Sequence, residues 1–149
     1  MTRKLAAPAA PDPTAVHRHP VRIYYEDTDL AGIVYHANYL RFIERGRTEA
    51  LRAAGLDQGR LKAEAGLVFV VHRIEADFLV PARFDDALVV ETCVTEKKRA
   101  SLTMMQTVMR EASALFRARV RLACMDAEGR PVRLPAEMEE ALARLGIGP

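Results

Sequence analysis

The fold of this chain is limited most by one feature of the sequence, a long stretch with helical hydrophobic periodicity followed by four stretches with the alternation of strands. The stretch from Tyr35 to Ala54 contains no proline, and its apolar residues recur every three or four positions, as in an amphipathic helix. Four later stretches alternate apolar and polar residues, as strands with one buried face do. One long helix must bury its apolar stripe against the sheet, so the pattern predicts an α+β fold. The four stretches are Val68–Phe78, Leu88–Val94, Leu102–Arg110 and Phe116–Leu122.

Shorter elements complete this architecture. Val21–Tyr25 is β-branched and aromatic and predicts a first strand, which gives a five-stranded sheet. The later strands follow one another through short connections, which favours antiparallel pairing. Leu56–Gly66 and Pro135–Leu145 predict short helices. Gly46 lies within the apolar face of the long helix, where glycine is costly, so we expect close packing against the sheet at that point.

The chain is long enough for one domain. Its 149 residues suit a single core, assigned to residues 20–149, and residues 1–19 read as a flexible Ala/Pro-rich leader. Prolines interrupt the leader, which lacks the apolar core of a signal peptide, and no later stretch predicts a membrane span. We therefore expect a cytoplasmic protein. The formal net charge of +2 gives no reason to expect nucleic acid or a membrane as partner.

The two cysteines predict no redox or metal chemistry. Cys93 and Cys124 each lie in an apolar run and neither belongs to a CxxC pair, so both are interpreted as buried hydrophobic residues. His17 and His19 form an isolated H-x-H without further ligands. The sequence also lacks G-x-S-x-G, the nucleophile motif of α/β-hydrolases. No metal and no cofactor are expected.

The chemically dense part of the chain runs from Tyr24 to Tyr39. It carries three carboxylates (Glu26, Asp27 and Asp29) and His36 just before the long helix. A helix N-terminus offers unpaired N–H groups that can hold negative charge on a carbonyl oxygen. A nearby carboxylate can activate water or attack directly. Helix caps and turns also explain many such clusters, so the residues alone leave both interpretations open.

This segment resembles the signature of hotdog-fold thioesterases of the 4-hydroxybenzoyl-CoA thioesterase type. Within them it is most similar to the Tol–Pal-associated acyl-CoA thioesterase branch. The pattern D-x-D-x-x-G-x-V-Y-H is long and specific, and the similarity covers about residues 20 to 135. The matching runs are Val21–Asp29, Gly32–Tyr39, Phe42–Glu49, Phe69–Val71 and Pro81–Asp86.

The resemblance implies a reaction and roles for particular residues. Acyl-CoA would be hydrolysed to a carboxylic acid and CoA, with Asp29 as nucleophile or general base. The backbone N–H of His36 would polarise the thioester carbonyl. The His36 side chain and Tyr25 match accessory catalytic positions, expected to orient the substrate or Asp29. Glu26 and Asp27 are expected to have turn or capping roles.

A basic run is the candidate site for the CoA phosphates. Lys97, Lys98 and Arg99, followed by Ser101, stand between two predicted strands. These residues are interpreted either as a solvated turn or as a phosphate clamp. The second interpretation is open because lysine and arginine suit phosphate recognition. The resemblance supports the clamp, since hotdog thioesterases commonly hold the nucleotide end near this connection, and it leaves the two interpretations about even. Arg83 is a weaker candidate.

Three alternatives remain beside the acyl-CoA thioesterase. The substrate can be an acyl-carrier-protein thioester, and the chain can be a noncatalytic acyl-CoA-binding module on the same fold. A hotdog hydratase is the third, although its signatures are not found in this sequence. The resemblance also implies a homodimer or homotetramer with active sites at the subunit interface. The sequence does not define the acyl group.

Overall fold

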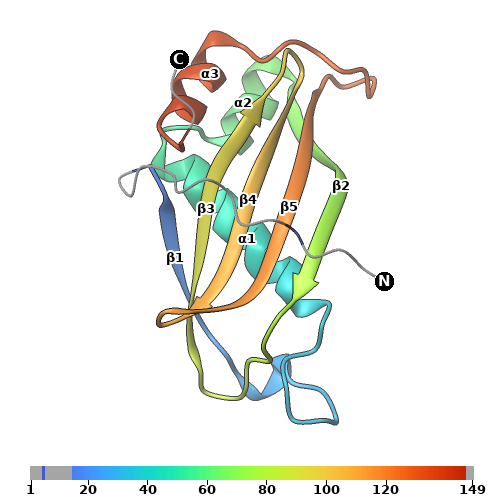
Figure 1. Cartoon of the computed structure of the whole chain (residues 1–149). Coiled ribbons are helices and arrows are strands. Elements are labelled where there is room, and N and C mark those ends of the chain that lie inside the picture. The colour runs from blue at the N-terminus through green and yellow to red at the C-terminus, as the bar shows by residue number, and fades with distance from the viewer. Residues whose placement is uncertain (1–4, 6–14, 147–149) are drawn as a thin grey trace.

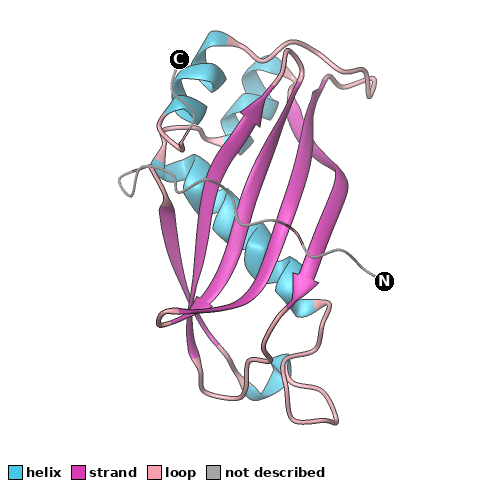
Figure 2. Cartoon of the chain, viewed as in Figure 1, coloured by secondary structure: helices cyan, strands magenta, loops and turns pink. Residues whose placement is uncertain are grey.

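The computed structural model describes Leu5 and residues 15–146. They form one antiparallel sheet in the order β1-β3-β4-β5-β2, with α1 across one of its faces (Figures 1 and 2). This arrangement confirms the predicted α+β fold of five strands and one long helix. The elements are β1 (His17–Arg22), the 3-10 turn η1 (Tyr25–Asp27), α1 (Asn38–Ala53), α2 (Gln58–Ala65), β2 (Val68–Phe78), β3 (Ala87–Lys97), β4 (Ser101–Arg110), β5 (Ser113–Met125) and α3 (Ala136–Ala143).

The first strand differs from the prediction at both ends. β1 begins at His17, where His17 pairs with Thr92 of β3, so the strand includes residues that the sequence assigned to the leader. Pro20 is tolerated because β1 is an edge strand, where a missing donor costs no ladder bond on the open side. Tyr25 is outside the strand and begins η1. Residues 1–4 and 6–14 of the predicted leader lie outside the described residues.

The core lies between α1 and the sheet. The buried face of α1 includes Phe42, Ile43 and Gly46. A Cβ on Gly46 would stand 2.5 Å from Cγ1 of Val90, a residue of β3 with no exposed surface. Glycine is therefore required here because the backbone of α1 approaches β3 closely, which confirms the close packing expected at this position.

A buried glutamine ties α1 to two strands. Gln106 of β4 has no exposed surface. Its Nε2 donates to the Ile43 carbonyl at 2.8 Å and to Thr92 Oγ1 at 2.9 Å. Its Oε1 accepts from Nη1 of Arg47 at 3.0 Å. Because buried amides are costly when unpaired, these three bonds hold the helix at one place along the sheet.

The two short helices lie at the same end of the sheet (Figure 1). Leu61 of α2 and both Met138 and Leu142 of α3 are buried against the core. In the described part of the chain, no helix is long and apolar enough to cross a membrane.

Candidate active site

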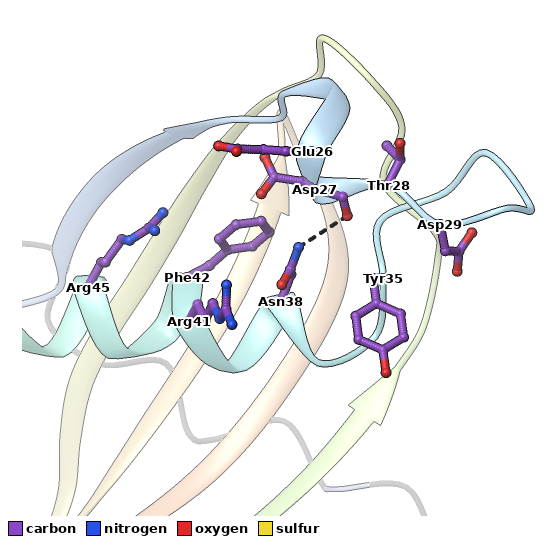
Figure 3. A pocket seen from close by; sticks show the side chains of 9 residues that line it. All are labelled: Glu26, Asp27, Thr28, Asp29, Tyr35, Asn38, Arg41, Phe42 and Arg45. Atoms are coloured by element: carbon purple, nitrogen blue, oxygen red, sulfur yellow. Dashed lines mark hydrogen bonds between the residues drawn. The ribbon is translucent and has the colours of Figure 1, made fainter.

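The segment between β1 and α1 folds back beside the first turn of the helix. The Asp27 carbonyl accepts from the Tyr35 N–H at 2.9 Å and from Nδ2 of Asn38 at 3.2 Å (Figure 3). The Val34 N–H donates to the Ala82 carbonyl at 2.9 Å. The segment is therefore fixed both to the helix and to the connection between β2 and β3.

Asp29 stands in a tight turn within this segment. Its N–H donates to the Ile33 carbonyl at 2.9 Å, and its Oδ1 accepts from the Ala31 N–H at 2.9 Å. The turn includes Gly32, whose φ of +80° favours glycine. The Asp29 side chain therefore stabilises the turn, but only through one of its two carboxylate oxygens. Oδ2 has no hydrogen-bond partner among the described residues.

Two cavities meet at Asp29. One, the apolar pocket, has a volume of about 310 Å³, and the other, the polar pocket, about 320 Å³. Among the described residues, Asp29 is the one that lines both. In Figure 3 its side chain is directed away from Arg41 and Arg45 of the polar pocket. Besides Asp29, the apolar pocket is lined by Ile33, Val34, His36, Tyr39, Phe78, Leu79, Val80 and Pro81. The polar pocket is lined by Glu26, Asp27, Thr28, Tyr35, Asn38, Arg41, Phe42 and Arg45.

His36 lies in the apolar pocket immediately before α1. Its imidazole is exposed and packs near the rings of Tyr35 and Phe78, at centroid distances of 4.6 Å and 6.2 Å. Its backbone N–H has no acceptor among the described residues, whereas the N–H groups of Tyr35 and Asn38 are both bonded. This unpaired donor lies at the positive end of the α1 dipole, where it can donate a hydrogen bond to an oxyanion that forms during the reaction.

Tyr39 is part of the pocket wall rather than an acid. Its ring is 3% exposed and stacks on Phe116 at a centroid distance of 5.0 Å. Burial raises the pKa of the phenol. Its oxygen accepts the Ala82 N–H at 3.1 Å, which attaches the β2–β3 connection to α1.

The structure does not bring Tyr25 into either cavity that contains Asp29. The Tyr25 side chain is 84% exposed and lines a separate shallow depression with Tyr24 and Phe84. Asp27 has the predicted capping role, because its Oδ2 accepts from the Tyr24 N–H at 2.8 Å.

The basic run lies at the opposite end of the sheet from Asp29 (Figure 1). Ala87 at the start of β3 pairs with Arg22, the last residue of β1 before the Asp29 segment. Lys97 ends β3 ten residues later, which at the rise of a strand is about 33 Å away. The run forms the predicted turn, in which the Lys98 N–H donates to the Ser101 carbonyl at 2.8 Å. Arg99 is exposed in that turn.

Residues 78–81, which line the apolar pocket, were not identified as site residues from the sequence. An ion pair at the far side of the β2–β3 connection holds that connection in place, with Arg110 Nη1 at 2.8 Å from Asp86 Oδ2. Desolvation opposes ionisation of Asp86, but the bonds from the Arg83 N–H and from Arg110 outweigh it and lower the pKa of the carboxyl. Arg83 is exposed in this connection. The sequence signal that could have pointed to this connection as part of the site was the similarity of the run Pro81–Asp86 to the thioesterase pattern.

The described residues contain no group of three or more His, Cys, Asp or Glu side chains that could hold a metal ion. Cys93 and Cys124 are buried free thiols, and burial raises the pKa of each. The chemistry that this arrangement offers is a half-buried carboxylate and an unpaired backbone donor on two residues that line the same apolar pocket.

Comparison with known proteins defines the class. Residues 23–142 match the Thioesterase-like superfamily, and the chain belongs to that superfamily. It is 46% identical over 127 residues to the acyl-CoA thioesterase YbgC of Haemophilus influenzae, covering 85% of this chain and 93% of that protein. It is 43% identical over 114 residues to the acyl-CoA thioester hydrolase YbgC of Escherichia coli O157:H7, covering 76% of this chain and 84% of that protein.

Solved structures confirm the hotdog fold. A mutant of 4-hydroxybenzoyl CoA thioesterase complexed with 4-hydroxybenzoyl CoA superposes with a TM-score of 0.81 at 26% identity, covering 86% of this chain and 99% of that one. A probable thioesterase from Bartonella henselae superposes with a TM-score of 0.78 at 40% identity, covering 80% of this chain and 99% of that one.

Proposed function

We propose that this chain is an acyl-CoA thioesterase that hydrolyses acyl-CoA to a carboxylic acid and CoA. One observation carries the proposal: Asp29 stands where an apolar and a polar pocket meet, with Oδ2 unpaired. A thioester has an apolar acyl part and a polar pantetheine part, so its reacting carbonyl belongs at such a junction. The two YbgC relatives carry names that describe the same activity.

The reaction needs two groups at the carbonyl. The backbone N–H of His36 would donate to the thioester oxygen, a contribution typically worth about 3 kcal/mol of barrier. Asp29 would attack the carbonyl carbon through Oδ2, which expels the CoA thiolate and leaves a mixed anhydride that water then hydrolyses, or it would take a proton from a water that attacks the carbonyl and pass it to the departing thiolate. The CoA thiolate is a good leaving group, so the site requires no strong acid at the sulfur. The acyl group would occupy the apolar pocket.

The accessory residues differ in how well the geometry supports them. The His36 side chain lines the apolar pocket, so it can contact a bound acyl group. Tyr25 lies outside both cavities of its own chain, and its accessory role stays a prediction. We expect Tyr25→Phe to reduce kcat/KM much less than a change at Asp29.

The phosphate clamp would come from another subunit. Lys97, Lys98, Arg99 and Ser101 lie about 33 Å along the sheet from their own Asp29 segment. Sheet edges that remain open invite pairing, and here β1 and β2 are both edge strands. A homodimer or homotetramer would place the basic run of one subunit near the Asp29 of another. The cytoplasmic location stays a prediction.

Thiol release tests this function. Wild type would be assayed with a thiol-reactive dye on acyl-CoA thioesters of several lengths and an aromatic one, with acyl-carrier-protein thioesters in a second series. Turnover of acyl-CoA is the expected result. Turnover of carrier-protein thioesters alone would favour the first alternative. Saturable acyl-CoA binding without release of thiol would favour a noncatalytic module.

A further inference from the structure

Phe78 is the largest exposed apolar side chain in the wall of the apolar pocket. It ends β2 and is 56% exposed. Its backbone is held in the sheet, where it pairs with Phe116. The ring therefore starts from a fixed anchor, while half of its surface remains free to meet a ligand.

The ring of Phe78 covers two buried aromatic residues. It packs edge-on against Phe116 at a centroid distance of 5.1 Å and against Tyr39 at 5.7 Å. Phe116 has no exposed surface, and Tyr39 is held by its bond from the Ala82 N–H. Removal of the Phe78 ring would open the pocket onto an apolar floor that stays in place.

The ring also lies beside the carbonyl site. His36, whose N–H is the proposed oxyanion donor, packs edge-on against Phe78 at 6.2 Å. An acyl chain whose carbonyl oxygen is bound at His36 would extend along this ring. The size of the side chain at position 78 would then determine how many methylene groups of the acyl chain can be buried against the pocket wall.

We propose that Phe78 determines the length of the acyl group that the enzyme accepts. This inference rests on the proposed thioesterase function and adds a specificity residue to it. The chemical class concerned is the acyl part of the thioester, and residue 78 acts on chain length rather than on the chemical step. A smaller side chain should favour longer acyl groups, and a larger one should favour shorter groups.

The test measures kcat/KM on straight-chain thioesters from acetyl-CoA to palmitoyl-CoA for wild type, Phe78→Ala, Phe78→Leu and Phe78→Trp. Phe84→Ala is the matched control, because Phe84 is 61% exposed on the β2–β3 connection and lines no cavity containing Asp29. We expect Phe78→Ala to raise the long-to-short ratio of kcat/KM about tenfold or more, since single methylenes in apolar pockets are discriminated by such factors.

The outcomes separate this inference from the function on which it rests. Phe78→Leu should shift the optimum in the same direction as alanine, and Phe78→Trp should shift it toward shorter chains, while Phe84→Ala keeps the wild-type profile. A uniform fall on all substrates, or an unchanged profile in active Phe78 variants, would overturn the role of Phe78 and leave the thioesterase intact. Wild type that turns over no acyl-CoA would overturn both. If Phe78→Ala does not fold, the leucine and tryptophan variants decide.

Discussion

Replacement of Gly46 by alanine tests how α1 is seated on the sheet. The new Cβ would stand 2.5 Å from Cγ1 and 3.1 Å from Cβ of Val90, far inside the optimal carbon–carbon separation of about 3.5–4.0 Å. Val90 is completely buried, so the helix or the strand must shift. Overpacking of this kind costs about 1–3 kcal/mol, and alanine returns about 1 kcal/mol of helix propensity. Because 2.5 Å demands a large shift, we expect a net loss of about 1–2 kcal/mol.

Urea unfolding at fixed protein concentration measures this loss. Gly59→Ala in α2 is the matched control, because its new Cβ would meet nothing closer than Asp57 Oδ1 at 3.4 Å. This control should gain up to about 1 kcal/mol. In a Val90→Ala background the Gly46→Ala change should cost less than in wild type, since the atom that clashes is absent. A Gly46→Ala variant as stable as wild type, or more stable, would refute the packing described for α1.

Three further predictions concern buried groups. Gln106→Leu leaves Thr92 and Arg47 without a buried partner, so urea unfolding should show a loss of about 1–3 kcal/mol; an unchanged midpoint would contradict the role of the glutamine. Cys93 and Cys124 have a raised pKa because they are buried, and a thiol reagent should label neither before denaturant is added; rapid labelling of the native protein would count against this burial. The pKa of His17 is lowered from 6.5 by burial and by His19. The unfolded state therefore binds the proton more readily, and the free energy of unfolding should fall as the pH drops through about 6.5; a His17→Leu variant with the same pH dependence would contradict it.

Local sequence pattern was sufficient for the main elements. The helical period around Gly46 and the alternation from Val68 to Leu122 predicted α1 and the four later strands, because both report which face is buried. β1 was misplaced because His17–Pro20 carries no apolar alternation. This edge strand forms through its pairing with β3, which the local pattern does not contain.

The candidate site was predictable where it is contiguous in the chain. Asp29 and His36 lie seven positions apart in one segment, so a motif could bring them together. The other wall of the apolar pocket comes from Phe78 to Pro81, and it reaches Asp29 through long-range contacts such as the bond from the Val34 N–H to the Ala82 carbonyl. The place of the basic run at the far end of β3 likewise follows from strand direction, which the motif did not include.

The catalytic role proposed for Asp29 is tested by the kcat/KM of Asp29→Asn on the best acyl-CoA substrate. Asparagine keeps an oxygen that can accept the Ala31 N–H and removes the charge. Glu64→Gln removes a charge from the exposed face of α2 and serves as the control. We predict a fall of at least about a hundredfold for Asp29→Asn, with an unfolding curve like that of wild type and full activity in the control. Activity of Asp29→Asn within a few-fold of wild type would contradict the central role of this carboxylate.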